Sequence, residues 1–257
     1  METRDYHTLQ VSAAKGIATL MLNVPERKNP LGPQMVNELL YALDDARDAR
    51  EVRVIVLTGA GAAFSAGGDL KQMGGGDLAP KGDFADLLLR FRDLGKPTVA
   101  RIPGHCYGGG LGLVAACDFA IACESAKLGT PEVKRGLFPM MIMALLQQLV
   151  PRRELIRMML LGERLGAAEA KALGLVTDVV PDDDLDAATA ELAQKLAAQS
   201  PTALSRGLRA FHRQREMPLE EALPFLRGEL FGILGTEDAR EGLRAFVEKR
   251  EPVWTGR

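Results

Sequence analysis

The sequence predicts an α/β fold with a largely parallel sheet, followed by a helical C-terminal segment. Short runs of β-branched and apolar residues alternate with amphipathic stretches through most of the chain, and strand signals stop after residue 181. The connections between successive strands are long enough for crossovers, which parallel pairing requires. Glycine clusters follow several predicted strands, at the place where α/β folds put their ligands.

The first elements can be assigned in order along the chain. Residues 9–11 and 17–22 are β-rich and flank Ala14-Lys15-Gly16, which predicts a hairpin. Apolar residues at helical spacing predict a helix over 34–50, and a continuous β-branched run predicts a buried strand over 52–58. The next predicted elements are a helix, a strand, a small-residue helix and a strand, over 84–94, 97–102, 110–116 and 119–122.

The composition of the chain shifts after Pro181. Three aspartates at 182–184 precede a predicted helix over 185–199, where negative charge suits the N-terminal end of the helix dipole. Three further helices are predicted over 201–216, 219–234 and 237–249. We therefore divide the chain into a core over 1–195 and a helical segment over 196–257.

Composition narrows the class of protein. The chain has 257 residues, of which 47% are apolar, so it can bury a substantial core. A net charge of −2 gives no overall electrostatic case for binding nucleic acid or an anionic membrane. The local arginine clusters have the helical spacing of solvated helix faces.

Cysteine and terminal patterns suggest a reducing compartment. The three cysteines are odd in number and lie in apolar surroundings, which is typical of buried thiols rather than of a disulfide framework. No paired Cys or His spacing points to a metal site. The N-terminus leads into no apolar secretory signal, and the longest apolar stretch is broken by Pro139. We expect a cytoplasmic protein with no membrane span and no bound metal.

The triple glycine at 108–110 is the most informative local feature. Because it lacks side chains, this turn can approach a ligand closely and offer backbone N–H groups to a developing oxyanion. A Thr130-Pro131-Glu132 tripeptide follows, and it supplies a carboxylate that could move a proton. A second cluster, residues 66–69, could aim further N–H groups at the same oxygen, although alone it fits an ordinary capped turn equally well.

A dinucleotide-binding interpretation is the main alternative for the glycines that follow the strand at 52–58. Gly59 and Gly61 match the start of that fingerprint, but its third glycine would fall at Phe64. No acidic residue closes a clear second strand about twenty residues later. A tight turn leaving a strand explains Gly59 and Gly61 better.

Over almost its whole length the chain resembles the enoyl-CoA hydratase/isomerase (crotonase) superfamily. The matching stretches are FSAGGDL (64–70), KPTVA (96–100), GGG (108–110), CD (117–118), LGTPEV (128–133), AKALGLV (170–176) and REG to FVEKR (240–250). The resemblance implies a crotonase-like spiral of ββα units in the core, with the segment 196–257 serving trimerisation. It also implies an acyl-CoA substrate, no separate cofactor, and a homotrimer or a dimer of trimers.

The resemblance also implies the parts of a site. Backbone N–H groups of Gly68 and Gly109 would form an oxyanion hole for a thioester, with Gly108 beside them. Ala66 and Lys71 fall where such proteins approach the adenine and phosphates of CoA. Lys71 could equally be a solvated lysine in a turn.

One departure from the family pattern affects the expected reaction. Family hydratases use two glutamates, but here the first position is Gly112 and only Glu132 is retained. One carboxylate can move a double bond from the 3,4 to the 2,3 position, as in the monofunctional isomerases that this chain resembles. We therefore expect double-bond isomerisation or hydration by Glu132 alone. If the site has room, Gly112→Glu should raise hydration.

Other functions remain open at this stage. A decarboxylase or a thioester hydrolase of the same fold would need the same oxyanion hole with other side chains. A non-catalytic acyl-CoA binder would tolerate loss of Glu132, and Glu132 could also be a surface residue that starts a helix.

Two further positions are candidate substrate contacts. His105 lies beside the triple glycine and could bind water or the substrate tail, although a hydrogen-bonded structural role is more common for such a histidine. Met140 begins a methionine-rich stretch that could line a pocket for the acyl tail. Core packing on a buried helix is the favoured interpretation of that stretch. Glycines at 74–76 suggest a mobile lid.

Overall fold

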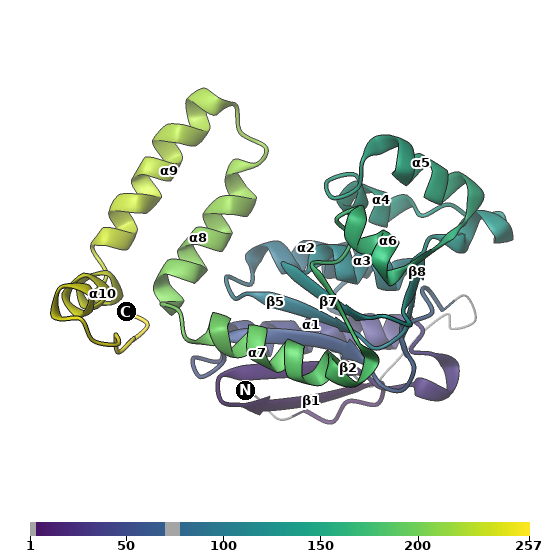
Figure 1. Ribbon diagram of the computed structural model, residues 1–257, viewed down its shortest axis with the longest axis horizontal. Helices are drawn as coiled ribbons and strands as arrows, with labels where there is room; N and C mark the ends of the chain where they lie inside the picture. The colour runs from purple at the N-terminus through teal and green to yellow at the C-terminus, as the bar shows by residue number, and fades with distance from the viewer. Residues whose placement is uncertain (1–3, 70–77) are drawn as a thin grey trace.

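The computed structural model describes residues 4–69 and 78–257, which form two sheets covered by helices (Figure 1). The larger sheet is six-stranded, in the order β1-β2-β3-β5-β7-β10. Its strands are β1 (Leu9–Ala14), β2 (Ile17–Leu22), β3 (Val54–Gly59), β5 (Thr98–Ile102), β7 (Phe119–Cys123) and β10 (Asp178–Val180). β1 and β2 form the predicted antiparallel hairpin, and the other neighbouring strands pair in parallel, as predicted.

The smaller sheet shows how the chain spirals. It has the order β4-β6-β8-β9, with β4 (Ala63–Ser65), β6 (His105–Tyr107), β8 (Lys127–Gly129) and β9 (Arg164–Gly166). After each of β3 and β5 in the larger sheet, the chain adds one strand to the smaller sheet, and after β7 it adds two, β8 and β9. It returns to the larger sheet through α2 (Phe84–Arg90) after β4 and through α3 (Gly109–Ala116) after β6, whereas α4 (Met140–Leu146) follows β8 and leads toward β9. The predicted spiral of ββα units is therefore confirmed.

Alternating side chains of β3 explain why helices cover both faces of the larger sheet. Val54 and Val56 pack on one face in a small cluster with Ala193 of α7 (Leu185–Ala197). Ile55 and Leu57 point to the opposite face and join the main core, which also contains the apolar side of α1 (Pro33–Asp48). Successive residues of a strand face opposite ways, so a strand buried on both faces is apolar throughout.

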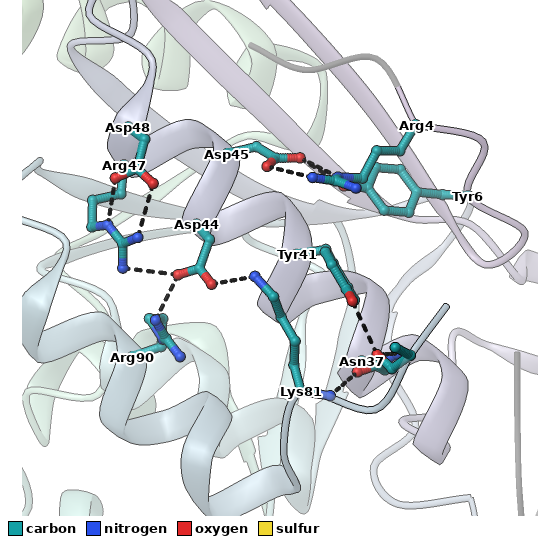
Figure 2. A network of polar contacts seen from close by, with 11 residues as sticks. Arg4, Tyr6, Asn37, Tyr41, Asp44, Asp45, Arg47, Asp48, Lys81 and Arg90 are labelled. Carbon is teal, nitrogen blue, oxygen red and sulfur yellow. Dashed lines mark hydrogen bonds and ion pairs between the residues drawn. The ribbon is translucent and has the colours of Figure 1, made fainter. Parts of the chain in front are cut away.

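Two short helices and a polar network complete the core. α5 (Arg152–Leu161) and α6 (Ala167–Ala172) flank β9. Figure 2 shows the network that ties α2 and the segment before it to α1: Asp44 accepts hydrogen bonds from Lys81, before α2, at 2.5 Å and from Arg90, the last residue of α2, at 2.6 Å. Asn37 also accepts from the backbone N–H of Lys81, at 2.8 Å. These bonds hold in place the start of α2, and with it Phe84.

The C-terminal segment is helical, as predicted. α8 (Pro201–Gln214), α9 (Leu219–Leu234) and α10 (Glu237–Glu248) lie to one side of the sheets, at the opposite end of the molecule from α4 and α5 (Figure 1). Many large apolar side chains on these helices are exposed, namely Phe211, Leu219, Leu223, Leu230, Phe231, Leu234, Leu243, Phe246 and Val247. Of the helices that the structure describes, none has both the length and the apolar character of a membrane span.

Candidate active site

Two glycine turns, one after each of two neighbouring strands, pack against each other. Gly67 follows β4 with φ of 95°, and Gly108 follows β6 with φ of 53°. A side chain would be strained in either conformation, and there is no space for one at Gly67, where a Cβ would lie 3.0 Å from the carbonyl oxygen of Tyr107. Because β4 and β6 are paired in parallel, both turns emerge at the same edge of the smaller sheet.

The amides predicted to form an oxyanion hole lie next to each other. Gly109 is the first residue of α3, so its N–H has no acceptor within the helix. A Cβ built on Gly109 would be 3.7 Å from the backbone nitrogen of Gly68. Among the described residues, neither of these two N–H groups has a backbone acceptor outside its own element. Both amides are therefore available to a ligand.

The Glu132 carboxylate lies beside these turns. It belongs to the 3-10 turn Pro131–Arg135, which follows β8, and β8 pairs in parallel with β6. A Cβ on Gly108 would be 2.9 Å from Glu132 Oε1, so the carboxylate lies against the Gly108 backbone. Glu132 Oε2 is buried and has no hydrogen-bond partner among the described residues. The surface interpretation of this glutamate is therefore wrong.

Burial of the carboxylate also changes its acidity. Removal from water raises the pKa of Glu132 above its usual value, because burial disfavours the charged form. A hydrogen bond from its own backbone N–H and the positive charge of Arg135 oppose this shift. A buried acceptor without a partner is uncommon in folded proteins, and beside a cavity it is typical of a group reserved for a ligand.

These groups line one cavity of about 190 Å³. Its wall consists of Ala66, Gly67, Gly68, Phe84, Gly108, Gly109, Pro131, Glu132, Arg135, Leu137, Phe138, Pro139, Met140, Met141 and Ile142. The structure thus brings together most of the predicted site residues: Ala66, Gly68, Gly108, Gly109, Glu132 and Met140. A larger cleft of about 800 Å³ between the end of α1 and α8 contains none of them.

Gly112 was expected to contact the substrate, but it does not line the cavity. It is buried in α3, and a Cβ at this position would overlap the Cγ2 methyl of Ile142 and lie 3.1 Å from its Cβ. Ile142 is itself 3% exposed. The place that the family's first glutamate would take is therefore filled by a side chain of α4. The site has no room for Gly112→Glu by itself.

His105 is also separate from the cavity. It shares one face of β6 with Tyr107, and their rings stack with centroids 5.6 Å apart. The Tyr107 hydroxyl and His105 Nδ1 lie 3.3 Å apart, and Arg164 covers the Tyr107 ring. This arrangement corresponds to the structural role for His105, and the predicted contact with substrate is not supported.

The methionine stretch divides between the two interpretations. Met140 and Met141 are 62% and 50% exposed, so core packing is wrong for them, and both line the cavity. Ile142 in the same helix is buried, as core packing predicts. Lys71 and the glycines at 74–76 lie outside the described residues.

Phe84, Arg135 and Phe138 line the cavity but were not identified from the sequence, and Ile142 was noted only as part of the methionine-rich stretch. Phe84 lies far from the glycine turns in sequence, yet its Cζ would be 3.3 Å from a Cβ on Gly109. Arg135 could have been noticed from its spacing, since i and i+3 residues eclipse in a 3-10 helix and it follows Glu132 by three. No sequence signal pairs Ile142 with Gly112. Within residues 4–69 and 78–257, no group of His, Cys, Asp or Glu side chains is suited to hold a metal ion.

Comparisons with known proteins agree with this geometry. The family model described as enoyl-CoA hydratase/isomerase matches residues 12–257. A carnitinyl-CoA dehydratase of Salmonella heidelberg is 38% identical over 221 residues, covering 82% of this chain and 84% of the relative. An enoyl-CoA hydratase domain-containing protein 3 of Xenopus laevis is 33% identical, over 93% of this chain and 83% of the relative.

Solved structures agree as well. The crystal structure of an enoyl-CoA hydratase from Bacillus anthracis superimposes with a TM-score of 0.90 at 31% identity, covering 98% of this chain and 100% of that one. Human enoyl-CoA hydratase domain-containing protein 3 superimposes with a TM-score of 0.90 at 29% identity, covering 96% and 100%. The chain belongs to the enoyl-CoA hydratase/isomerase family.

Proposed function

We propose that this protein isomerises 3-enoyl-CoA thioesters to 2-enoyl-CoA, with Glu132 as the group that carries the proton. The observation that favours isomerisation over hydration is the packing of Ile142 against Gly112, which leaves Glu132 as the one carboxylate among the cavity residues described. A hydratase has to position a water as well as deliver a proton to carbon. Isomerisation moves one proton between two carbons.

The steps balance with the groups present. Glu132 takes the proton from C2, and the electrons of that C–H bond pass into a dienolate whose charge rests on the thioester oxygen. The N–H groups of Gly68 and Gly109 hold this oxygen, and each donor aimed at the developing charge is worth about 3–4 kcal/mol. Glu132 then returns the proton to C4. The thioester carbonyl reforms and the double bond lies between C2 and C3.

The environment of Glu132 supports the role of base. Its raised pKa makes the carboxylate a stronger base than an exposed glutamate. Its partnerless oxygen needs no hydrogen bond to be broken before reaction. The mostly apolar wall of Phe84, Phe138 and Ile142 would exclude water from the dienolate.

A substrate panel in ¹⁸O-labelled water tests this function. The enzyme should convert a 3-enoyl-CoA to a 2-enoyl-CoA without label, and it should form little labelled 3-hydroxyacyl-CoA from a 2-enoyl-CoA. The Glu132→Gln protein is the control for non-enzymatic conversion. Faster formation of labelled alcohol than of isomer would replace isomerisation with single-glutamate hydration. Release of free CoA or of carbon dioxide would indicate a hydrolase or a decarboxylase.

Two further features belong to this proposal. CoA enters as part of the substrate, and no separate cofactor takes part. The protein assembles as a trimer or a dimer of trimers through α8, α9 and α10, since their exposed apolar side chains need a partner surface to be buried. Sedimentation should give a mass of three or six chains, and Phe246→Asp, at a side chain that is 83% exposed, should lower it. A monomeric parent protein would contradict the assembly without affecting the proposed chemistry.

A further inference from the structure

One charged side chain of the cavity has no part in the proposed reaction. Arg135 lines the cavity from the last position of the 3-10 turn that carries Glu132. Residues three apart in a 3-10 helix eclipse each other, so both side chains leave the turn on the same side. Arg135 is exposed to solvent, and it lines the same cavity as Glu132 and the apolar residues 137–142.

Arg135 has no partner within the part of the chain that the structure describes. No ion pair or side-chain hydrogen bond joins it to any described residue, although Glu132 lies on the same turn. Its charge acts on Glu132 only as a weak opposition to the raised pKa. The other cavity residues are glycine, alanine, proline or large apolar residues, so Arg135 is the one cation among those described.

An arginine in this position is suited to an anion. The guanidinium stays charged at all physiological pH values, and its planar fork of N–H donors matches a carboxylate with two parallel hydrogen bonds. A hydrocarbon tail offers no acceptor to those donors, so a purely alkyl acyl group would gain no hydrogen bond or charge pairing from Arg135. A carboxylate on the tail would satisfy Arg135 and leave Glu132 free to act.

We propose that Arg135 selects acyl-CoA thioesters whose acyl chain carries a second carboxylate, that is, monothioesters of dicarboxylic acids. This inference rests on the proposed function in placing the thioester at the amides of Gly68 and Gly109. The guanidinium pairs with the distal carboxylate while the thioester oxygen occupies the oxyanion hole. The substrate is thus held at both ends, with the carbons that exchange the proton between them.

Binding of unreactive, saturated thioesters tests the inference without turnover. The probes are the CoA monothioesters of the four- to seven-carbon dicarboxylic acids, each compared with the monocarboxylic acyl-CoA of equal length, by calorimetry. At the best length, the parent protein should bind the dicarboxylic thioester at least about tenfold more tightly. Arg135→Met should weaken that binding by about 10- to 100-fold and leave the monocarboxylic thioesters unchanged. Arg135→Lys should retain part of the preference, since a point charge replaces the fork.

Lys134→Met is the matched control. It removes the same charge from the adjacent position, and Lys134, which is exposed like Arg135, does not line the cavity. Lys134→Met should leave the affinity for both dicarboxylic and monocarboxylic thioesters unchanged. Thermal melting verifies that each variant is folded. Equal affinity of the parent for both classes at every length would overturn the inference. If Arg135→Met weakens the binding of dicarboxylic and monocarboxylic thioesters equally, the inference is also overturned, and Arg135 contacts the CoA phosphates instead.

The two proposals can fail separately. If the protein does not isomerise any 3-enoyl-CoA but binds dicarboxylic thioesters through Arg135, the selectivity stands and the reaction is wrong. If it isomerises 3-enoyl-CoA with no preference for a distal carboxylate, the reaction stands and the selectivity is wrong.

Discussion

Replacing Gly112 by glutamate, alone and together with Ile142→Ala, tests the packing that favours isomerisation. A Cβ at position 112 would overlap the Ile142 Cγ2 methyl, so the single Gly112→Glu variant is overpacked in a buried helix. Overpacking of this kind costs about 1–3 kcal/mol, and enclosing a carboxylate adds to that. We expect the variant to lose at least about 2 kcal/mol of unfolding free energy.

Ile142→Ala removes the obstructing methyl groups. By itself it should destabilise the protein by about 2 kcal/mol, the low end for truncating a buried isoleucine, because this side chain borders an existing cavity. In the double variant the new glutamate occupies the vacated space, so the two losses should not add. The coupling free energy should be favourable by about 1–3 kcal/mol, the range for residues in direct contact.

Activity provides the second readout. A second carboxylate beside Glu132 should raise hydration of a 2-enoyl-CoA, relative to isomerisation, by at least about tenfold, since a positioned acid/base group is typically worth 10²–10⁴. Gly112→Gln with Ile142→Ala is the control, because it has the same shape without the charge. Urea denaturation measures stability, and label from ¹⁸O water measures hydration.

Two results would refute this reasoning. A single Gly112→Glu variant as stable as the parent would show that Ile142 does not fill this space. A folded double variant that hydrates no faster than its glutamine control would show that the missing carboxylate does not limit hydration.

Four further predictions concern Glu132 and the turn beside it. Glu132→Gln should lower turnover by about 10² or more and leave the acyl-CoA Kd nearly unchanged, and equal turnover would remove Glu132 from the mechanism. Because burial raises the pKa of Glu132, kcat/KM should fall toward acid with a midpoint above the usual 4.5, and a midpoint at or below it would contradict the assigned environment. Because the pKa of Glu132 is raised in the folded protein, folding stability falls as the pH rises from 4.5 through that pKa. The Gln variant should therefore be more stable than the parent at neutral pH and match it in acid. Gly108→Ala should reduce turnover more than Gly136→Ala, because both glycines have positive φ but only the Cβ at 108 would meet Glu132 Oε1, at 2.9 Å; equal effects would mean that backbone strain alone explains the loss.

The sequence predicts the long elements well because their patterns are local. The helix predicted over 34–50 is α1, Pro33–Asp48, and the β-branched run at 52–58 is β3, Val54–Gly59. The strands β4, β6, β8 and β9 have three residues each. They were not predicted, because so short a run shows no hydrophobic periodicity. Their pairing brings the two glycine turns together, so the convergence of the site depends on the elements that sequence patterns define least.

The candidate site divides in the same way. The glycine turns and Glu132 carry backbone and chemical signals of their own, and they were predicted. The contact of Ile142 with Gly112 joins α4 to α3, and that of Phe84 with Gly109 joins α2 to α3. Such contacts arise from packing between elements and have no local signature. The condition set for Gly112→Glu, that the site has room, is not met for this reason.

Within the described residues no ion pair joins Glu132 to Arg135, and this links the basicity of Glu132 to the proposed recognition of the acyl tail by Arg135. An ion pair between them would stabilise the carboxylate, lower its pKa and weaken it as a base. The structure instead leaves Glu132 Oε2 buried without a partner and Arg135 without an ion pair, each within the described residues. Leaving such a buried group unsatisfied costs about 1–3 kcal/mol, which folding has to offset elsewhere. A substrate with a distal carboxylate would neutralise Arg135 and remove its opposition to the raised pKa of Glu132. Binding of the correct tail would therefore make the carboxylate more basic at the moment that it has a proton to take.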